Sequence, residues 1–360
     1  PLLGTHLSKW SVDKTPVPDV ASGLLEPVAH PHWKNPCELA DSFANYIGAS
    51  GFRHSDAMSA YNKFLHPLLR AVLERAEHVQ DSAPKSTRVI MASDLDPTYS
   101  FFLPLTAQLW IKFGLKPWFN LVGTRERWAD SATGRLVLDE LETIGADIKF
   151  ISPVEGFSTG TLAQVSRLYS ACLGLEDSEV CMTSDADMWP LSGDCWSPVP
   201  GANMTHWVFD GNKSHFICYE SAAVSVWREL MGPKSADISE AVRLQLLEGL
   251  TGQNDPMRVW CYDEELLNGK LKEWANYNKS SYIIRKIGPH YLPVGRVDRS
   301  RWEFDGNLAG KMDAHCLRPG FTEDNWAKLG QLFKAVFPDR YAWADDYAAR
   351  FRSACHGWIA

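Results

Sequence analysis

The feature that most limits the fold of this chain is an alternation of short strand-like runs with helix-like segments between residues 88 and 183. The runs are rich in β-branched, aromatic and other apolar residues, and the segments between them carry apolar residues at helical spacing. Strands that alternate with helices form a parallel-dominated sheet with helices on both faces. We therefore expect an α/β fold with a mostly parallel central sheet flanked by helices. The strands are expected at residues 88–93, 118–123, 147–151 and 179–183, and the helices at 101–113, 134–144 and 161–173.

The segments on either side of this region follow a different pattern. Residues 1–40 are rich in Pro, His and small polar residues, which predicts an extended arm. After Pro190 the predicted elements become shorter and less regular. The elements predicted outside the alternating region are a packing helix at 61–77, a strand at 215–219, and helices at 236–248 and 264–274. We expect three regions, at residues 1–85, 86–190 and 191–360.

The composition excludes several classes of protein. Of the 360 residues, 45% are hydrophobic and 22% are charged, as in a globular protein and unlike a disordered or collagen-like chain. The 44 acidic residues outnumber the 36 basic ones, and no Lys/Arg run could follow a phosphate backbone, so we expect no nucleic-acid partner. No stretch approaches about 18 uninterrupted apolar residues, so we expect no membrane contact within the chain. The chain begins at Pro1 rather than Met, which indicates processing or truncation and leaves a removed anchor as an open alternative.

Cysteines and glycosylation triplets bear on the compartment. The eight cysteines form no C-x-x-C pair and no zinc-like spacing, so we expect buried thiols, with disulfides as the open alternative. Three N-x-S/T triplets begin at Asn203, Asn212 and Asn278, where the composition predicts about one by chance. They favour a secretory compartment such as the Golgi lumen, and the cytoplasm is the alternative.

Two aspartates follow the last strand of the alternating region. In an α/β sheet, ligands collect at the carboxyl ends of the strands, and Asp185 and Asp187 come directly after the strand expected at 179–183. Carboxylates at this spacing can both reach one divalent cation, which in turn holds a diphosphate by its oxygens. The alternative is a pair of solvated turn residues, because Asp favours turns.

A second acidic cluster follows the first strand and allows two interpretations. In one, Asp94 accepts hydrogen bonds from a nucleoside base and Tyr99 stacks on it. In the other, the segment Asp94-Leu95-Asp96-Pro97-Thr98 is the D-x-D-x-T motif of haloacid-dehalogenase-like phosphatases, with Asp94 as nucleophile and Asp96 as acid or base. Those enzymes also need a downstream Lys and a closing acidic pair, and the sequence shows neither clearly.

Fifteen tryptophans are available for stacking or for packing. Aromatic rings stack on the apolar faces of sugars, but they fill protein cores more often. The tryptophan content therefore keeps a non-catalytic carbohydrate-binding protein open as an alternative.

Several of these residues occur in the order of a known family, over about residues 88–320. They are Ser93-Asp94 with Tyr99, Arg167 in a helix, Asp185-Ala186-Asp187 after a strand, Asp263-Glu264-Glu265-Leu266-Leu267-Asn268, and a late His315. In this order they resemble the GT-A glycosyltransferases, nearest to the retaining group with glycogenin and bacterial lipopolysaccharide galactosyltransferases. That group has a D-Q-D-x-L-N segment after the metal motif, and D-E-E-L-L-N is similar to it. The resemblance implies a Rossmann-type GT-A-like fold, with nucleotide-sugar binding by residues 86–190 and acceptor binding by 191–360.

The resemblance also implies roles for single residues. Nucleotide or donor contacts would come from Ser93, Asp94, Tyr99, Arg167 and Asp185. Ligands of Mn²⁺ or Mg²⁺ would be Asp185, Asp187 and His315, a donor set that suits Mn²⁺. Catalytic carboxylates beside the sugar would be Asp263 and Glu264. The alternatives are an ordinary polar or core histidine at 315, and acidic residues at 263 and 264 that merely suit a helix N-terminus.

Two positions depart from the family's pattern. A Lys-Pro-Trp is expected six residues after the histidine, whereas Arg318-Pro319-Gly320 stands three residues after it, so the resemblance does not support a diphosphate contact by Arg318. Glu264 stands where the group has Gln, which weakens the assignment to retaining enzymes.

The resemblance implies a metal-dependent hexosyl or pentosyl transferase. It would move a sugar from a nucleotide-sugar donor, with a UDP-sugar favoured, to a hydroxyl of a glycan or glycoconjugate acceptor, with retention favoured over inversion. The phosphatase and the non-catalytic carbohydrate-binding protein stay open as alternatives. Residues available for acceptor binding are Trp196, Trp207, Trp227, Trp260 and His290.

Overall fold

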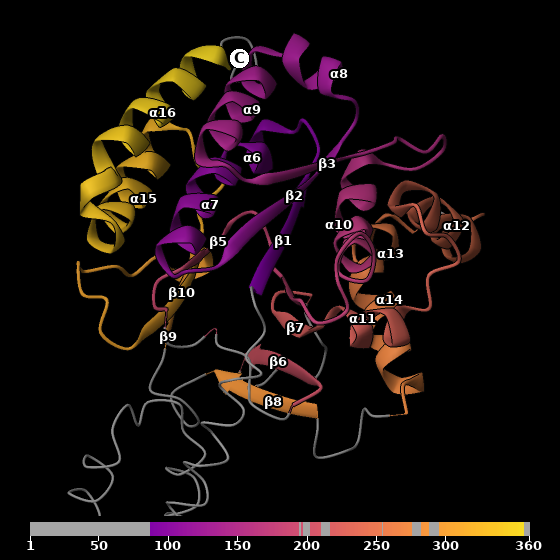
Figure 1. Cartoon of the computed structure of the whole chain (residues 1–360). Helices are drawn as coiled ribbons and strands as arrows, with labels where there is room; N and C mark the ends of the chain where they lie inside the picture. The colour runs from indigo at the N-terminus through magenta and orange to yellow at the C-terminus, as the bar shows by residue number, and fades with distance from the viewer. Residues whose placement is uncertain are drawn as a thin grey trace, which may run out of the picture. The chain divides into compact units, whose positions relative to one another are not determined.

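The predicted alternation of strands and helices forms the centre of the fold (Figure 1). The computed structural model describes residues 87–193, 196, 202–209, 217–253, 255–275, 282–287 and 295–355. The predicted arm at 1–40, the packing helix at 61–77 and the whole region 1–85 therefore lie outside the described residues. Within them, the α/β class with a mostly parallel central sheet is confirmed.

Seven strands form the central sheet in the order β3-β2-β1-β4-β7-β6-β8. Their bounds are β1 (Thr87–Ser93), β2 (Lys116–Val122), β3 (Asp147–Ile151), β4 (Val180–Thr183), β6 (Met204–Phe209), β7 (Glu220–Ala223) and β8 (Tyr282–Ile287). Strand β7 runs antiparallel to its neighbours β4 and β6, and the other neighbouring pairs are parallel. The carboxyl ends of β1 to β4 therefore meet at one edge of the sheet.

A smaller sheet brings the C-terminal region to the end of β4. It has the order β5-β10-β9, with β5 (Met188–Pro190), β10 (Lys311–His315) and β9 (Gly295–Asp298). In its register, His315 lies opposite Met188 on one side and Asp298 on the other. Residues far apart in the sequence are thus placed beside the Asp185–Asp187 segment.

Helices cover both faces of the central sheet (Figure 1). They are α6 (Pro97–Ser100), α7 (Phe102–Lys112), α8 (Arg125–Asp130), α9 (Ala132–Ile144), α10 (Thr159–Ser170), α11 (Val224–Met231), α12 (Ile238–Leu250), α13 (Pro256–Trp260), α14 (Tyr262–Glu273), α15 (Glu323–Val336) and α16 (Tyr341–Ala354), with short 3₁₀ helices η3 (Arg299–Arg301) and η4 (Pro338–Arg340). Because successive strand residues face opposite sides, Val89 and Met91 of β1 pack in the core under α7, α9, α15 and α16, whereas Ile90 packs under α10, α11, α12 and α14.

Polar caps start two helices at the carboxyl edge of the sheet. The Asp96 carboxylate accepts a hydrogen bond from the Thr98 N–H, and Pro97 occupies the first position of α6. The Ser158 hydroxyl accepts from the Thr161 N–H at the start of α10. Such caps pair backbone donors that the helix itself leaves unpaired, so the turns after β1 and before α10 have defined conformations.

The strand predicted at 215–219 is wrong for its described residues. Residues 217–219 form a bend and a turn, and the strand β7 begins only at Glu220. Strand β7 begins only there because its neighbour β4 pairs with it through residues 180–182. Beyond that point the Ile217 carbonyl instead accepts a hydrogen bond from the Thr183 side chain.

The regions 86–190 and 191–360 contribute strands to the same central sheet, and residues from Pro84 onward form one compact unit. The six described cysteines are free thiols, whereas Cys37 and Cys195 lie outside the described residues. Among the described helices, none is long and apolar enough to cross a membrane.

Candidate functional site

A pocket of about 850 Å³ opens at the carboxyl ends of β1 and β4. From β1 the chain crosses to β2 on one side, and from β3 it returns to β4 on the other side of β1. The connections that leave these two neighbouring strands diverge, and ligands of open α/β sheets bind in the crevice at such a point. The structure brings all the site residues predicted from the sequence into this pocket, namely Ser93, Asp94, Tyr99, Arg167, Asp185, Asp187, Asp263, Glu264 and His315.

The loop after β1 is held by its own aspartate. Asp94 Oδ1 accepts a hydrogen bond from the Asp96 N–H at 3.0 Å, and Asp94 Oδ2 accepts one from the Thr159 hydroxyl at 2.6 Å. The second bond connects this loop to the first residue of α10. The segment predicted to contact a nucleoside therefore forms one wall of the pocket together with the start of α10.

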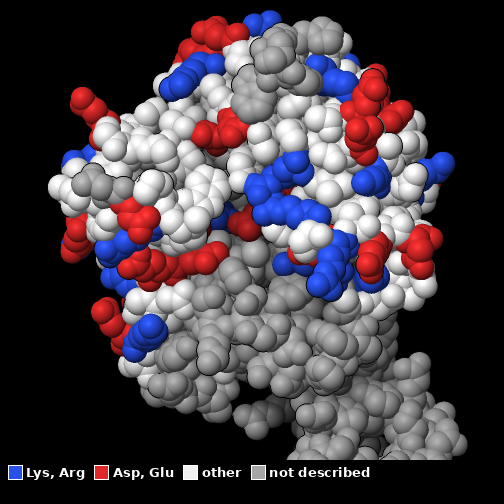
Figure 2. Space-filling model, turned by 180° about the vertical axis from the view of Figure 1, so that it is seen from behind, with Lys and Arg blue, Asp and Glu red and all other residues white. Residues whose placement is uncertain are grey.

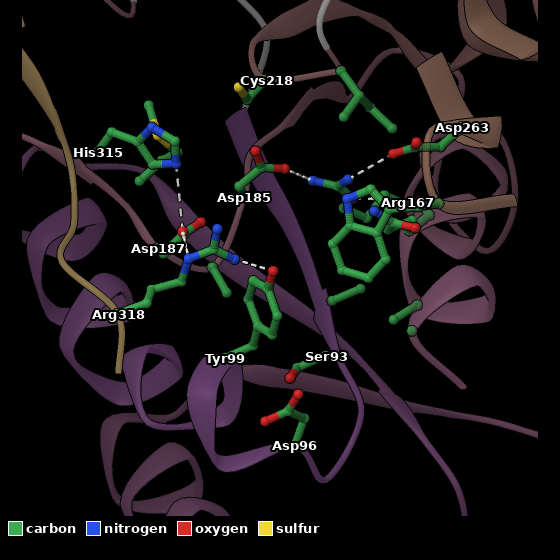
Figure 3. Close-up of a pocket in the computed structure, with 18 of the residues that line it drawn as sticks. Ser93, Asp96, Tyr99, Arg167, Asp185, Asp187, Cys218, Asp263, His315 and Arg318 are labelled. Carbon is green, nitrogen blue, oxygen red and sulfur yellow. Dashed lines mark hydrogen bonds and ion pairs between the residues drawn. The ribbon is translucent and has the colours of Figure 1, made fainter. Parts of the chain in front are cut away.

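Arg167 of α10 joins two of the predicted carboxylates (Figure 3). Its Nη1 contacts Asp185 Oδ1, and its Nη2 lies 2.9 Å from Asp263 Oδ2. Burial disfavours the charged guanidinium, but the attraction of the two carboxylates outweighs it and raises the pKa of Arg167 above its ordinary value. Arg167 thus connects the segment after β4 to the start of α14.

Asp187 lies buried among three basic side chains of the C-terminal region. Its Oδ2 is 3.0 Å from Arg299 Nη1, 3.3 Å from Arg318 Nε and 3.5 Å from His315 Nε2. Burial acts to raise the pKa of this carboxyl group, but His315, Arg318 and Arg299 outweigh it and hold the pKa below the ordinary value. Asp187 is therefore ionised at neutral pH, with cationic groups beside it that an anionic ligand could also contact.

Tyr99 lies between the loop after β1 and the Arg318 side chain that contacts Asp187 (Figure 3). Arg318 donates a hydrogen bond to its hydroxyl, and the guanidinium lies 4.7 Å from the centre of the ring. The ring centroid of Trp260 is 6.2 Å from that of Tyr99, with the rings tilted by 40°. Two neighbouring aromatic rings therefore line the pocket, with the Arg318 guanidinium over the ring of Tyr99.

Asp263 and Glu264 lie in the first turn of α14, where acidic side chains suit the helix dipole. Burial raises the pKa of Asp263, against the opposing effect of Arg167. Burial, with repulsion from Asp263 and Asp185, raises the pKa of Glu264 to about 7. Within the described residues of the chain, no side chain or backbone group donates a hydrogen bond to the Glu264 carboxylate. A carboxyl group that titrates near neutral pH in a pocket can act as acid or base.

The predicted metal ligands are only partly assembled. Asp187 and His315 face each other, and His315 Nδ1 lies 3.5 Å from Asp298 Oδ2, an arrangement in which a carboxylate orients a metal-binding imidazole. Asp185 instead points toward Arg167 (Figure 3), and among the described residues no three His, Cys, Asp or Glu side chains form a group that could hold a metal. Carboxylate and imidazole side chains suit a divalent cation. Asp185 Oδ2 and Asp187 Oδ1 accept no hydrogen bond from described residues, so both oxygens are available to such an ion.

Three charged pocket residues beside Asp187 and His315 were missed or discounted at the level of sequence. Arg299 and Asp298 belong to the run Arg296-Val297-Asp298-Arg299-Ser300-Arg301. The high density of charged residues in this run is the sequence signal that could have indicated them as pocket residues. Arg318 was discounted because of its spacing from His315, yet it contacts Asp187. Trp260 also lines the pocket, and it was named among the residues available for an acceptor without a signal that distinguished it from the other tryptophans.

Most of the residues predicted to be available for an acceptor are not available. The side chains of Trp196, Trp207 and Trp227 are 2% exposed or less and fill the core, so that prediction is wrong for them. His290 lies outside the described residues. Trp260 is 44% exposed and lines the pocket.

The pocket combines acidic and basic side chains. Seven carboxylates line it, against four guanidinium groups. The described face in Figure 2 likewise carries Asp and Glu next to Lys and Arg, without an extended surface of one sign. A diphosphate entering the pocket would add negative charge to an acidic lining, so an additional cation would favour its binding.

Comparison with known proteins gives distant structural likeness alone. No protein-family model matches the chain, and no curated protein matches it in sequence. The galactosyltransferase LgtC, solved with donor and acceptor sugar analogues, is 13% identical, with a TM-score of 0.39 over 71% of this chain and 99% of its own. The glycosyltransferase GlyE of Streptococcus pneumoniae TIGR4 is 12% identical, with a TM-score of 0.38 over 72% of this chain and 64% of its own.

A third similar structure is glucosyl-3-phosphoglycerate synthase from Mycobacterium tuberculosis in complex with Mg²⁺ and uridine diphosphate. It is 10% identical, with a TM-score of 0.29 over 57% of this chain and 83% of its own. At such scores the likeness does not decide a function, which depends on the side chains of the pocket.

Proposed function

We propose that the chain transfers a sugar from a nucleotide-sugar donor, with a UDP-sugar favoured, to a hydroxyl group of a glycan or glycoconjugate, and that the reaction depends on a divalent metal. The observation that carries the proposal is the pocket at the ends of β1 and β4. It holds a buried Asp187 with Arg299, Arg318 and His315 on one side, and Glu264 in its wall. Such a site can bind a diphosphate and place a carboxyl group near the sugar.

The donor's nucleoside would lie against the loop after β1. There Asp94 offers acceptor oxygens and Tyr99 an aromatic face, both on segments that hydrogen bonds hold in place. The diphosphate would lie against Arg299 and Arg318, whose guanidinium groups match the geometry of phosphate oxygens.

Asp187 and His315 would hold the metal ion, with Asp185 joining them through its second oxygen. When bound, a divalent cation supplies positive charge that neutralises the diphosphate leaving group. Asp298 would orient the His315 ring, because its carboxylate faces the imidazole nitrogen that does not face Asp187.

Arg299 and Arg318 would stabilise the negative charge that develops on the departing diphosphate, because cations already held in place need no reorganisation during the reaction. Glu264, when ionised, would stabilise the positive charge that develops on the sugar. Asp263 is committed to Arg167 and would position the start of α14. We propose retention of configuration, since D-E-E-L-L-N keeps three positions of the retaining group's segment. Proton NMR of the product's anomeric signal tests this point, and an inverted product would make Glu264 a general base.

The pocket favours transfer over the two alternatives. In a D-x-D-x-T phosphatase both aspartates act on the substrate, whereas here the Asp96 carboxylate caps α6. No described lysine lines the pocket. A non-catalytic carbohydrate-binding protein would present several tryptophans at its surface, but six described tryptophan side chains are fully buried.

Calorimetric binding of UDP, GDP and CDP, each with Mn²⁺ and with a chelator, tests the proposal. We expect one nucleotide, UDP, to bind with Mn²⁺ and not with the chelator. Asp187→Asn should weaken this binding on the order of 100-fold, because a metal ligand is lost.

The matched control is Asp139→Asn, an exposed position of α9 outside the pocket, which should bind like the wild type. Thermal unfolding of both variants checks that the fold is kept. Absence of binding by any nucleotide would overturn the proposal, and p-nitrophenyl phosphate turnover that Asp94→Asn abolishes would establish the phosphatase instead.

A further inference from the structure

Gln164 of α10 lines the pocket with a side chain that has no hydrogen-bond partner among the described residues. Its Oε1 atom is buried, and nothing in the described part of the chain donates a hydrogen bond to it. The hydrogen bond from Arg167 Nε goes instead to the backbone carbonyl of Gln164. Buried polar atoms of side chains are mostly paired in folded proteins. An unpaired amide in the wall of a pocket is therefore a candidate ligand contact.

Gln245 of α12 shows the same side chain with its partners. Its Oε1 accepts a hydrogen bond from the Tyr169 hydroxyl at 2.8 Å, and its Nε2 donates one to the Tyr262 hydroxyl at 2.7 Å. Both glutamines are half-buried on helices, but Gln245 does not line the pocket. The amide outside the pocket is thus paired within the protein, whereas the amide in the pocket wall is not.

The position of Gln164 in α10 limits which part of a donor it can contact. Thr159, Gln164 and Arg167 all line the pocket from this helix. At its start, the Thr159 hydroxyl bonds to Asp94 in the wall proposed for the nucleoside. Further along, Arg167 pairs with Asp263 at the start of α14. Gln164 therefore lies between the nucleoside wall and the carboxylates proposed to lie beside the sugar.

The parts of a nucleotide-sugar that fit between these walls carry hydroxyl groups, either on the ribose or on the transferred sugar. A hydroxyl group both donates and accepts hydrogen bonds, and a glutamine amide offers a carbonyl oxygen and an NH₂ group. The last torsion of the side chain has a broad, roughly twofold preference, so either group can turn toward the ligand. We propose that Gln164 binds a sugar hydroxyl group of the donor. This inference rests on the proposed glycosyl transfer.

Calorimetry on the wild type and Gln164→Leu tests the inference, because leucine keeps the helix propensity of glutamine but has no polar group. The ligands are UDP, 2′-deoxy-UDP, 3′-deoxy-UDP, UDP-glucose, UDP-galactose, UDP-N-acetylglucosamine and UDP-xylose, each with Mn²⁺. We expect the variant to bind at least one of them about tenfold more weakly, as for the loss of one hydrogen bond.

The ligands distinguish the two sources of the hydroxyl group. If it belongs to the ribose, UDP binds more weakly to Gln164→Leu, and one of the deoxy analogues binds equally to both proteins. If it belongs to the transferred sugar, UDP binds equally to both and a UDP-sugar binds more weakly to the variant. Equal affinities of the two proteins for every ligand that binds would overturn the inference.

Thermal unfolding separates ligand binding from a structural role. Gln164→Leu removes an amide that has no partner in the free protein, so its unfolding temperature without ligand should equal or exceed that of the wild type. Saturation with the affected ligand should raise it less than in the wild type. A lower unfolding temperature of the free variant would assign the amide to the fold and overturn the inference.

The matched control is Gln245→Leu, which loses two hydrogen bonds outside the pocket. It should lower the unfolding temperature and leave the binding of every ligand unchanged. Failure of the wild type to bind any nucleotide is a failure of the proposed function, and it is seen before the variants are compared.

Discussion

Asp263 and Glu264 are adjacent in the sequence but have different electrostatic surroundings. Asp263 is 2% exposed and paired with Arg167, so its charge is neutralised within the protein. Glu264 is half-buried near two other carboxylates, without a described hydrogen-bond donor. The first residue therefore holds the wall of the pocket together, and the second is available to a substrate.

The raised pKa of Glu264 makes a prediction about stability and pH. Its pKa rises from 4.5 to about 7 on folding, so between these values the Glu264 carboxyl group binds more protons in the folded protein than in the unfolded chain. The contribution of this group to the free energy of unfolding therefore falls as the pH rises through this window. Glu264→Gln has no carboxyl group to titrate at this position. We therefore expect it to be more stable than the wild type at pH 8 and equally stable near pH 4. Urea unfolding over a pH series measures the difference.

Glu273→Gln is the control for this series, because Glu273 is exposed on the same helix. Its effect on the free energy of unfolding should be small and nearly independent of pH. A constant difference between Glu264→Gln and the wild type at every pH would contradict the predicted titration.

At the scale of elements, glycines in α9 and α14 have opposite surroundings. A Cβ at Gly134 of α9 would lie 2.3 Å from the Trp128 carbonyl oxygen and 2.8 Å from a methyl carbon of Leu95. A Cβ at Gly269 of α14 would have no neighbour within 4 Å. Gly134 therefore permits a close approach between α9 and α8, while Gly269 has no such role.

This contrast predicts effects of opposite sign. Gly134→Ala should lower the free energy of unfolding by about 2 kcal/mol, because the carbonyl oxygen belongs to backbone that cannot move away cheaply. Gly269→Ala should raise it by about 0.5–1 kcal/mol through helix propensity. Denaturant unfolding of each variant measures both, and stabilisation by Gly134→Ala would contradict the packing of α8 on α9.

At the scale of the whole molecule, the two regions predicted at 86–190 and 191–360 depend on each other. Strand β4 pairs with β7, and β5 pairs with β10, so both partners come from beyond residue 190. The core under α15 and α16 is likewise built from both regions. The pocket also needs both regions. Asp187 lies in the first region, and its partners Arg299, Arg318 and His315 lie in the second.

We therefore expect a fragment of residues 87–190 not to fold by itself. It would leave the apolar faces of β4 and α7 without their partners. Circular dichroism during thermal unfolding should show no cooperative transition for this fragment, whereas a fragment of residues 87–355 should show one. A cooperative transition of the shorter fragment would mean that 191–360 is a separate domain.

The local pattern of the chain determined the elements that have a regular hydrophobic period. The strand at 147–151 was predicted with its observed bounds, and the helices α9, α10 and α14 within a few residues. The positions of Asp94 and Asp185 directly after strands also follow from the sequence, since a parallel sheet places all such residues at one edge. The short strands β5, β9 and β10 were missed, because they lie outside the regular alternation of strands and helices and form only through long-range pairing with one another.

The tertiary structure alone decided which charges meet. Arg299 and Arg318 reach Asp187 because β9 and β10 pair beside β5, and this long-range pairing leaves no local trace in the sequence. Burial likewise separated Trp260 from Trp196, Trp207 and Trp227, which are chemically identical in the sequence. The sequence by itself determined the fold class and the candidate site residues that follow strands, because both depend on local periodicity. Arg167, Asp263, Glu264 and His315 were instead named from the resemblance to a family's ordered motifs. The pairing, exposure and pKa of those residues depend on neighbours that only the folded chain brings together.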